Sequence, residues 1–310
     1  MRVLHVDSAR EWRGGQTQLR WLVEGSDDAL VLPRRALLRS CFPDAWPYGP
    51  VGLLRAIRAV QPDLIAAHTS QAHGLAVLQR RVPVIVHRRL DFPPRRSSRL
   101  KYAAAFGFVA VSRAVADVLE RSGVPGERIR VVYDGVRFAP GTPIARPSGP
   151  LVVAVGALVA HKGHASLVRA AALGGFRVWI AGEGPLRGSL ERLVARLDAP
   201  VTLLGQRDDV PDLLATADVF CHPSVDEGLG QGLIEARAAG CRIVATRRGG
   251  IPEIAGPGAR LVSEAAPSEL AEAVLAALSD PWPEPCLPDG LSAATLRQRT
   301  FDAYSSLAGI

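Results

Sequence analysis

Short, continuously apolar segments recur along the whole chain, and an amphipathic stretch separates each from the next. An apolar run of this length, without polar alternation, is typical of a strand buried on both faces of a sheet. Such strands alternating with helices form parallel sheets covered by helices on both sides, which is the α/β class. The strands are expected at 3–6, 30–32, 64–67, 82–86, 109–111, 129–132, 152–155, 177–181, 201–204, 219–221, 243–245 and 260–262.

A segment rich in proline and glycine at 140–150 interrupts this alternation and is typical of a linker. The 310 residues therefore predict two Rossmann-like domains with doubly wound parallel sheets, at 1–140 and 150–290. Folds of this type bind ligands at the carboxyl ends of their strands, so the two domains are expected to face each other across a cleft. A further helix is expected at 292–307, after a proline-rich stretch.

Charge is distributed unevenly between the two halves of the chain. Residues 1–145 contain 22 Arg or Lys and 12 Asp or Glu, whereas residues 146–310 contain 15 and 18. A basic half attracts phosphates, anionic lipid or nucleic acid, but the sequence contains no nucleic-acid recognition motif. We therefore predict a peripheral contact with an anionic membrane and no nucleic-acid partner. The alternative is a general preference for arginine, since only Lys101 and Lys162 are lysines.

The cysteine pattern and the hydropathy pattern predict the cellular location of the protein. The four cysteines form no Cys-x-x-Cys pair, and nothing suggests a disulfide or a zinc site. The first residues enter a strand directly, without the features of a signal peptide, and no apolar run approaches the ~20 residues of a membrane span. We expect a cytoplasmic protein, peripheral at the inner face of the membrane, that needs no metal and no cofactor. The adjacent Asp208 and Asp209 are interpreted as charges at a helix N-terminus.

The segment 218–253 carries the clearest chemical pattern, a strand followed by a glycine-rich loop and a helix at about 230–239. Seven residues separate Glu227 on the loop from Glu235 in the first turns of the helix, so both carboxylates are expected to face one pocket. The glycines Gly228 and Gly230 let backbone N–H groups approach a ligand closely, and a helix N-terminus favours phosphate. A nucleotide-diphosphate sugar has hydroxyls, which carboxylates can bind, and phosphates, which backbone amides can bind. The segment offers both kinds of group.

This segment resembles the Glu-x7-Glu signature of the family 4, or group 1, glycosyltransferases, which are retaining enzymes of GT-B fold. Four more segments resemble parts of the same family: a strand with a Lys-Gly loop, a Gly-x-Gly-Pro unit, a segment that cups the base, and the end of the N-terminal domain. They lie at 152–171, 178–193, 201–218 and 110–138. The resemblance implies an acceptor-side N-terminal domain, a C-terminal domain that binds the nucleotide sugar, and a last helix that crosses back onto the first domain.

The resemblance also implies roles for the residues of the signature. Glu235 would hold the ribose hydroxyls of the donor, and Glu227 would act as a catalytic residue that contacts the transferred sugar. The backbone amides of Gly228, Leu229 and Gly230 would line that sugar. Without the family, the two carboxylates are interpreted as a solvated acid and a charge near a helix N-terminus.

The cations of the site are implied in the same way. Lys162, in a His-Lys-Gly sequence, would neutralise the diphosphate leaving group as a point charge. The Arg that the family often carries a few residues earlier is replaced here by Ala157. Arg88, its neighbour Arg89, and Arg207 are candidates to supply the missing charge.

Two further predictions concern the N-terminal domain. Gly14 and Gly15, flanked by Arg13, resemble the family's Gly-Gly loop, which wraps the diphosphate and bounds the acceptor site. His87 follows a predicted strand, where many family members carry a His that faces the donor sugar and could orient it or assist proton transfer. The alternative for His87 is a structural histidine bonded to the backbone. The other six histidines are interpreted as structural or solvated.

Together these features predict a retaining glycosyltransferase, in particular a hexosyltransferase. It would move a sugar from a nucleotide-diphosphate sugar, with UDP-sugar favoured, to a hydroxyl of a glycan or lipid-linked acceptor, such as a precursor of a bacterial envelope polysaccharide or lipopolysaccharide. Two alternatives stay open. One is a GT-B enzyme like UDP-N-acetylglucosamine 2-epimerase, which needs no acceptor. The other is a non-catalytic protein that binds nucleotide sugars, favoured by Ala157 and opposed by Lys162, Glu227 and Glu235.

Overall fold

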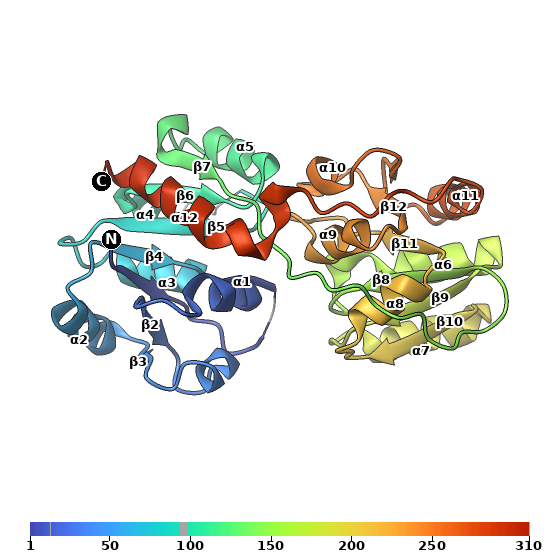
Figure 1. Cartoon of the computed structure of the whole chain (residues 1–310), viewed down its shortest axis with the longest axis horizontal. Helices are drawn as coiled ribbons and strands as arrows, with labels where there is room; N and C mark the ends of the chain where they lie inside the picture. Colours follow the sequence, from blue (N-terminus) through green and yellow to red (C-terminus); the bar gives the residue numbers. More distant parts are fainter. Residues whose placement is uncertain (13, 94–97, 310) are drawn as a thin grey trace. The chain divides into compact units, whose positions relative to one another are not determined.

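The computed structural model describes residues 1–12, 14–93 and 98–309. The chain forms two compact units, each with one parallel β-sheet flanked by helices (Figure 1). Unit 1 comprises Met1–Gly135 together with Ala293–Ile310, and unit 2 comprises Val136–Ser292. The chain therefore passes between the units twice. Both units belong to the α/β class, which confirms the fold class predicted from the sequence.

The sheet of unit 1 has seven parallel strands in the order β3-β2-β1-β4-β5-β6-β7. The strand order reverses between β1 and β4, so the connections diverge there and leave room for a ligand at the carboxyl ends. The strands are β1 (Val3–Val6), β2 (Ala29–Leu32), β3 (Trp46–Pro47), β4 (Leu64–Ala67), β5 (Val84–Arg88), β6 (Gly107–Ala110) and β7 (Ile129–Val131).

Helices from the described residues pack against this sheet, and the last of them comes from the far end of the chain. They are α1 (Gly14–Val23), α2 (Pro50–Val60), α3 (Ser70–Ala76), α4 (Arg99–Ala104), α5 (Arg113–Arg121) and α12 (Ala293–Ala308). Helix α12 contacts α1, β6 and β7. Its Tyr304 is fully buried in one core cluster with Leu64 and Ile85 of the central strands. The C-terminal helix is therefore an integral part of unit 1.

Unit 2 repeats the pattern with a six-stranded parallel sheet in the order β10-β9-β8-β11-β12-β13. Its strands are β8 (Leu151–Val155), β9 (Arg177–Ala181), β10 (Val201–Gly205), β11 (Val219–His222), β12 (Arg242–Thr246) and β13 (Arg260–Val262). Its helices are α6 (His164–Gly174), α7 (Arg187–Leu197), α8 (Val210–Thr216), α9 (Gln231–Ala238), α10 (Ile251–Ile254) and α11 (Pro267–Ala277).

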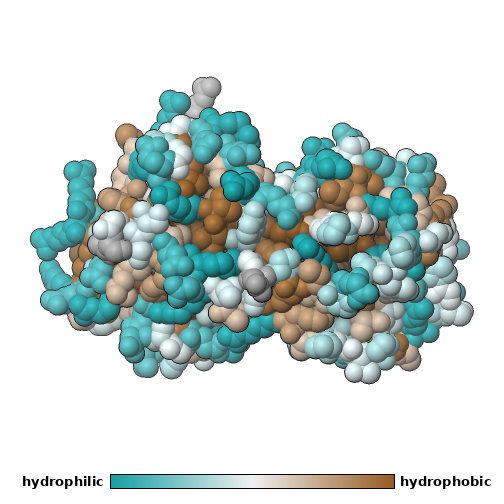
Figure 2. Space-filling view, turned by 45° about the horizontal axis from the view of Figure 1, so that its top comes forward, coloured by the Kyte–Doolittle hydropathy of each residue, from teal (hydrophilic) through white to brown (hydrophobic). Residues whose placement is uncertain are grey.

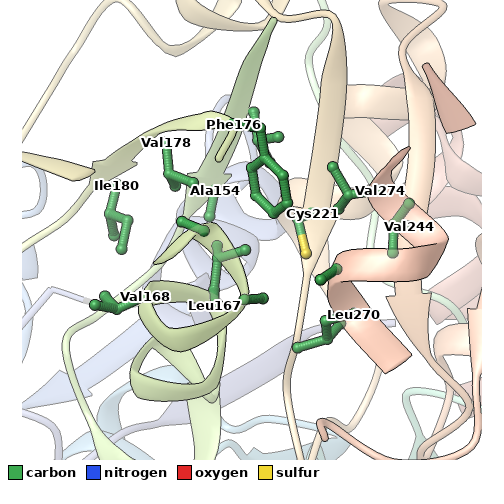
Figure 3. Packing of buried hydrophobic residues seen from close by; sticks show 14 of the residues in the cluster. Ala154, Leu167, Val168, Phe176, Val178, Ile180, Cys221, Val244, Leu270 and Val274 are labelled. Carbon is green, nitrogen blue, oxygen red and sulfur yellow. The ribbon is translucent and has the colours of Figure 1, made fainter. Parts of the chain in front are cut away.

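The core of unit 2 lies between the sheet and the helices α6 and α11. Leu167 and Val168 of α6 and Leu270 of α11 pack against Ile180 and Cys221 of the strands (Figure 3). All of these side chains are fully buried. Because burial of one such aliphatic side chain contributes roughly 1.5–3 kcal/mol, this layer fixes the strands whose carboxyl ends carry the candidate site.

The twelve strands expected from the sequence all form, with ends that shift by at most a few residues. Strand β3, which has two residues and lies at the edge of the sheet, was not predicted from the sequence. It lies in a segment where Pro33, Pro43, Pro47 and Gly49 interrupt any periodicity. A strand this short has no apolar pattern of its own, and only its pairing with β2 defines it.

Candidate functional site

In unit 2, two loops that follow neighbouring strands are held tightly against each other. A Cβ added to Gly163, which has φ +69°, would lie 1.9 Å from the carbonyl oxygen of Pro223. The backbone N–H of Val225 donates to the carbonyl of His161 at 2.8 Å. Only glycine permits this approach in this backbone conformation. The contact brings the Lys-Gly loop after β8 beside the Pro-Ser turn after β11.

At this junction, four side chains form one hydrogen-bonded group around Glu227. Lys162 Nζ forms an ion pair with Glu227 Oε2. The same oxygen contacts His222 Nε2 at 3.0 Å and accepts from Ser224 Oγ at 3.1 Å. Burial alone would raise the pKa of Glu227, but the hydrogen bond with His222 and the charge of Lys162 hold it well below its usual range. Glu227 is therefore ionised, and a phosphate that takes Lys162 as its partner would compete with it.

Three members of this neighbourhood were not predicted from the sequence. Ser224 was not assigned any role, and His222, the last residue of β11, was interpreted as structural or solvated. His164 was interpreted as structural or solvated. It is buried beside the backbone of Gly156 and Ala157. Burial first, and then the nearby His222 and Lys162, lower the pKa of His164 to about 4, so the ring is neutral at neutral pH.

The glycine-rich loop leads directly into α9. Gly230, with φ +100°, occupies the N-cap position of α9, and no side chain caps the helix. The first N–H groups of such a helix lack partners within it. Gly228 and Leu229 are both buried in the loop. The local structure therefore presents a helix N-terminus a few residues beyond Glu227.

Glu235 lies in α9, and its carboxyl group is largely buried. Burial raises the pKa of Glu235 to about 7, and a hydrogen bond with Gln231 offsets part of that rise. Within the described part of the chain, no lysine or arginine forms an ion pair with it. Glu235 is a buried acid without a charge partner, in contrast to Glu227, and such perturbed groups are typical of functional sites.

In unit 1, three histidines line up across adjacent strands. His5 Nδ1 lies 3.0 Å from His68 Nε2, and the His68 and His87 rings stack with centroids 4.3 Å apart. His87 Nε2 lies 2.6 Å from the hydroxyl of Tyr304 in α12. His87 is only 9% exposed. These contacts give His87 a structural partner 217 residues away, and its predicted contact with a donor sugar stays a prediction.

Acidification is expected to destabilise unit 1 through this histidine row. Burial lowers the pKa of His5 to about 4 and holds those of His68 and His87 well below 6.5. As the pH falls from 6.5 toward 4, the unfolded chain binds protons that the folded unit excludes, so stability present above pH 6.5 is lost. His5 alone should lower the free energy of unfolding by about 3 kcal/mol when the pH reaches about 4.

Hydrogen exchange of β1, β4 and β5 across this pH range measures the loss. His68→Asn should reduce the pH dependence, whereas His161→Asn, at an exposed position in unit 2, should leave it unchanged. An unchanged pH dependence in the His68 variant would contradict the assignment.

Gly14 and Gly15 are the first two residues of α1 rather than part of an extended loop. A Cβ added to Gly15 would lie 3.7 Å from Cδ of Arg89. Arg89 in turn forms an ion pair with Asp134 at 3.3 Å. Arg89 is thus the cation beside the start of α1 in this unit. Arg13, which precedes the glycines, lies outside the described residues.

The two other arginines considered for the missing charge have partners of their own. Arg88 is buried, donates to the carbonyl of Phe92, and lies over the Phe92 ring at 5.2 Å. Burial lowers the pKa of Arg88. Arg207, after β10, pairs with Asp209 through two hydrogen bonds. Their roles toward a ligand stay predictions.

The described residues contain neither a metal-binding cluster nor a helix that could span a membrane. In 1–12, 14–93 and 98–309, no three His, Cys, Asp or Glu side chains gather in a way that could hold a metal ion. Over the same residues, no helix has both the length and the apolarity required to cross a bilayer.

Two models of protein families match the chain, one for each part. The model for glycosyl transferases group 1 matches residues 149–280, and the model for Glycosyltransferase Family 4 matches residues 10–139. Together they cover most of the sequence, including Lys162, Glu227 and Glu235 in the first match and Gly14 and His87 in the second.

Individual proteins give the same assignment. The chain is 31% identical over 277 residues to an MMP alpha-(1->4)-mannosyltransferase of Mycolicibacterium hassiacum, covering 73% of this chain and 65% of the relative. It is 34% identical over 163 residues to the putative colanic acid biosynthesis glycosyltransferase WcaL of Escherichia coli, covering 46% of this chain and 40% of the relative. The chain thus spans less than two thirds of the length of these curated relatives.

A solved structure matches almost the whole length of the chain. The crystal structure of Anabaena HepE in complex with UDP and glucose matches with a TM-score of 0.83 at 20% sequence identity, over 99% of this chain and 100% of that one. At this identity the likeness concerns the fold. The two family matches and this fold place the chain in one family: it belongs to the group 1, family 4 glycosyltransferases and has their GT-B fold.

Proposed function

We propose that this chain is a retaining glycosyltransferase that transfers a sugar, a hexose, from a nucleotide-diphosphate sugar to a hydroxyl acceptor. The observation that carries the proposal is the pairing of Lys162 with Glu227 in unit 2, each just ahead of a helix N-terminus. One cation, one ionised acid and two helix N-termini suit a diphosphate attached to a sugar. Unit 2 would bind the donor and unit 1 would provide the acceptor side.

In this proposal the donor diphosphate takes over Lys162 from Glu227. Once released, Glu227 keeps its contacts with His222 and Ser224 and turns its second oxygen to the hydroxyls of the transferred sugar. Glu235, further along α9, accepts from the ribose hydroxyls. The backbone amides of 228–230 line the sugar. UDP is the favoured nucleotide, and the UDP bound to HepE, a protein of the same fold, supports that choice.

The proposed reaction proceeds on one face of the sugar. The bond from the anomeric carbon to the β-phosphate oxygen breaks, and its electron pair leaves with the phosphate. The acceptor hydroxyl forms the new bond on the same face, and its proton passes to the departing phosphate oxygen. Lys162 and the helix N-termini stabilise the charge that develops there. The chain itself then needs neither a nucleophilic carboxylate nor a general base.

The acceptor would be a glycan or lipid-linked precursor of a bacterial envelope polysaccharide or lipopolysaccharide. The name of WcaL, which concerns colanic acid biosynthesis, supports an envelope glycan. The protein would act in the cytoplasm, at the inner face of the membrane. Its donor site would be complete without a metal or a cofactor.

Thermal unfolding in the presence of UDP, GDP, ADP and their sugars tests the donor assignment. A ligand at ~100 times its dissociation constant adds roughly 2.7 kcal/mol to the free energy of unfolding, which is easily measured. The stabilising sugar is then incubated with the protein, and the products are separated. Release of nucleoside diphosphate and free or transferred sugar supports a transferase. Conversion to an epimeric nucleotide sugar would instead support the 2-epimerase alternative, and binding without turnover would support the non-catalytic one.

Activity is expected to survive EDTA. No cluster of three metal-ligating side chains exists in the described residues, and Lys162 with the helix N-termini supplies the positive charge that a divalent cation would otherwise provide. The measurement is nucleoside diphosphate release with and without the chelator. Loss of activity that magnesium or manganese restores would show that Asp208, Asp209 or Asp226 has been misinterpreted.

A further inference from the structure

One segment of unit 1 concentrates both positive charge and exposed apolar side chains. Residues 64–116 contain nine Arg or Lys and a single acid, Asp91. Within the same stretch, Leu78 is 75% exposed and Leu100 is 86% exposed. Phe106 is 47% exposed. Figure 2 shows hydrophilic and hydrophobic residues mixed over the face that it presents, and among the large apolar side chains of the described residues Leu100 and Leu78 have the largest exposed fractions. Exposed apolar side chains rimmed by polar residues mark interaction surfaces.

Helix α4 is anchored along one side and exposed along the other. Lys101 donates to Ser70, and Tyr102 stacks on Phe108 with ring centroids 5.3 Å apart. His73 contacts the carbonyl of Lys101 at 2.8 Å. The opposite side, 99, 100, 103 and 104, is exposed to solvent. Leu100 is therefore exposed on an anchored helix, and among the described residues of unit 1 no contact buries this apolar side chain.

Unit 1 has a groove with a volume of about 930 Å³ beside α4. It is larger than a groove of about 630 Å³ on unit 2. The residues that line this larger groove include the end of α4, Phe106, Arg80 and Arg81. Phe106 is held in place because its N–H donates to the carbonyl of Val84 at 2.8 Å and its carbonyl accepts from Arg128 at 3.1 Å. Glu127 also lines the groove. Phe106 thus lines the groove together with Arg80, Arg81 and Arg128.

We propose that this face of unit 1 binds the surface of an anionic phospholipid bilayer. The face, called the α4 face below, consists of Leu78, Arg80, Arg81, Arg99, Leu100 and Phe106. Its arginines would pair with lipid phosphates, while the aliphatic and aromatic side chains enter the boundary between headgroups and acyl chains.

The apolar members decide between a membrane and the other common polyanion, a nucleic acid. Arginines alone serve either partner, since both present phosphates. Leu78 and Leu100 cannot stack on bases as aromatic side chains do, and burying them against phosphates gains nothing. In a bilayer the same leucines leave water for hydrocarbon, which is favourable. The proposal goes beyond sugar transfer and does not depend on it, because binding to lipid needs no sugar donor.

Sedimentation of the full chain with vesicles tests the proposal. Vesicles of phosphatidylcholine mixed with phosphatidylglycerol should bind the protein, vesicles of phosphatidylcholine alone should bind it much less, and added salt should weaken the binding. The double variant Arg80→Gln/Arg81→Gln should bind about 25-fold more weakly, which is about fivefold for each arginine. Leu100→Ser should weaken binding at least about tenfold.

Matched controls come from elsewhere on the surface. Arg34→Gln/Arg35→Gln changes another exposed pair of adjacent arginines in unit 1, and Leu173→Ser changes a leucine of unit 2 that is 67% exposed. Both should bind vesicles like the unaltered protein. Unchanged thermal unfolding and donor hydrolysis in the α4-face variants would show that they fold.

Two results would overturn the proposal. One is that the α4-face variants and the controls bind anionic vesicles equally well. The vesicles would then be attracted by the total charge of the basic N-terminal half and not by the α4 face. The other is tight binding of an oligonucleotide duplex with no binding of anionic vesicles. A protein that binds vesicles but transfers no sugar would leave the α4 face supported and remove the proposed function.

Discussion

Replacing Lys162 with alanine is expected to lower turnover by about 10²–10³-fold while changing donor affinity much less. The negative charge on the β-phosphate grows as the glycosidic bond breaks, so a cation there stabilises the transition state more than the bound donor. Ala157, which replaces the usual arginine, cannot compensate. Lys162→Arg should restore only part of the rate, because a planar guanidinium does not reproduce the geometry of a point charge.

Steady-state kinetics of donor hydrolysis or transfer measure this effect. Lys101 is the only other lysine in the sequence, so Lys101→Ala is the matched control and should retain normal turnover on a soluble substrate. Normal turnover with only a raised Michaelis constant in Lys162→Ala would make Lys162 a plain binding residue. A variant unchanged in both constants would mean that the loop after β8 does not face the donor, and the site would then be rebuilt around Arg88 and Arg89.

Replacing Glu235 with glutamine is expected to weaken the binding of a nucleotide sugar but to stabilise the fold. Loss of a charged acceptor for the ribose hydroxyls costs on the order of 1.5–3 kcal/mol, so Glu235→Ala and Glu235→Gln should bind a nucleotide sugar roughly 10–100-fold more weakly. Burial raises the pKa of Glu235 from 4.5 to about 7, so ionising it at higher pH opposes folding. Glu235→Gln should therefore raise the free energy of unfolding above pH 7, by about 1–3 kcal/mol.

The pH dependence of binding provides a second measurement on Glu235. A carboxylate that accepts from hydroxyls must be ionised, so affinity should be constant above about pH 7 and fall about tenfold for each pH unit below it. A nucleotide sugar is the appropriate ligand, because its diphosphate carries no secondary ionisation in this range. Glu235→Gln should bind with little pH dependence. Unchanged affinity in the variant would remove the role at the ribose.

The sequence predicted the fold closely because each strand has its own local pattern. The segment Leu64–Ala67, for example, is apolar and short and lies between Asp63 and His68, so its ends are visible without any partner. The edge strand Trp46–Pro47 has no such pattern, and its identity depends on pairing with β2. Local physics therefore decides where most strands lie, whereas an edge pairing must be seen in three dimensions.

The candidate site was predictable as a set of residues but not as a set of contacts. Lys162 and Glu227 are 65 residues apart, and they meet because Gly163 admits the carbonyl of Pro223. No periodicity encodes that approach. Likewise, the sequence indicates only that His87 lies at the end of a strand. Its partner Tyr304 comes from the last helix, 217 residues away. Side chains brought together by close backbone packing, such as His222 with Glu227, leave no spacing signal.

The return of α12 to unit 1 has a consequence for how the chain folds during synthesis. Residues 136–292 form one continuous unit and can fold as soon as they leave the ribosome. Unit 1 emerges earlier but lacks the helix that carries Tyr304, whose side chain fills the core beside Leu64 and Ile85. Until that helix is made, the central strands keep an open apolar face. Residues 1–135 are therefore expected to complete their fold after residues 136–292, although they are synthesised earlier, and chaperones are expected to engage them during the delay.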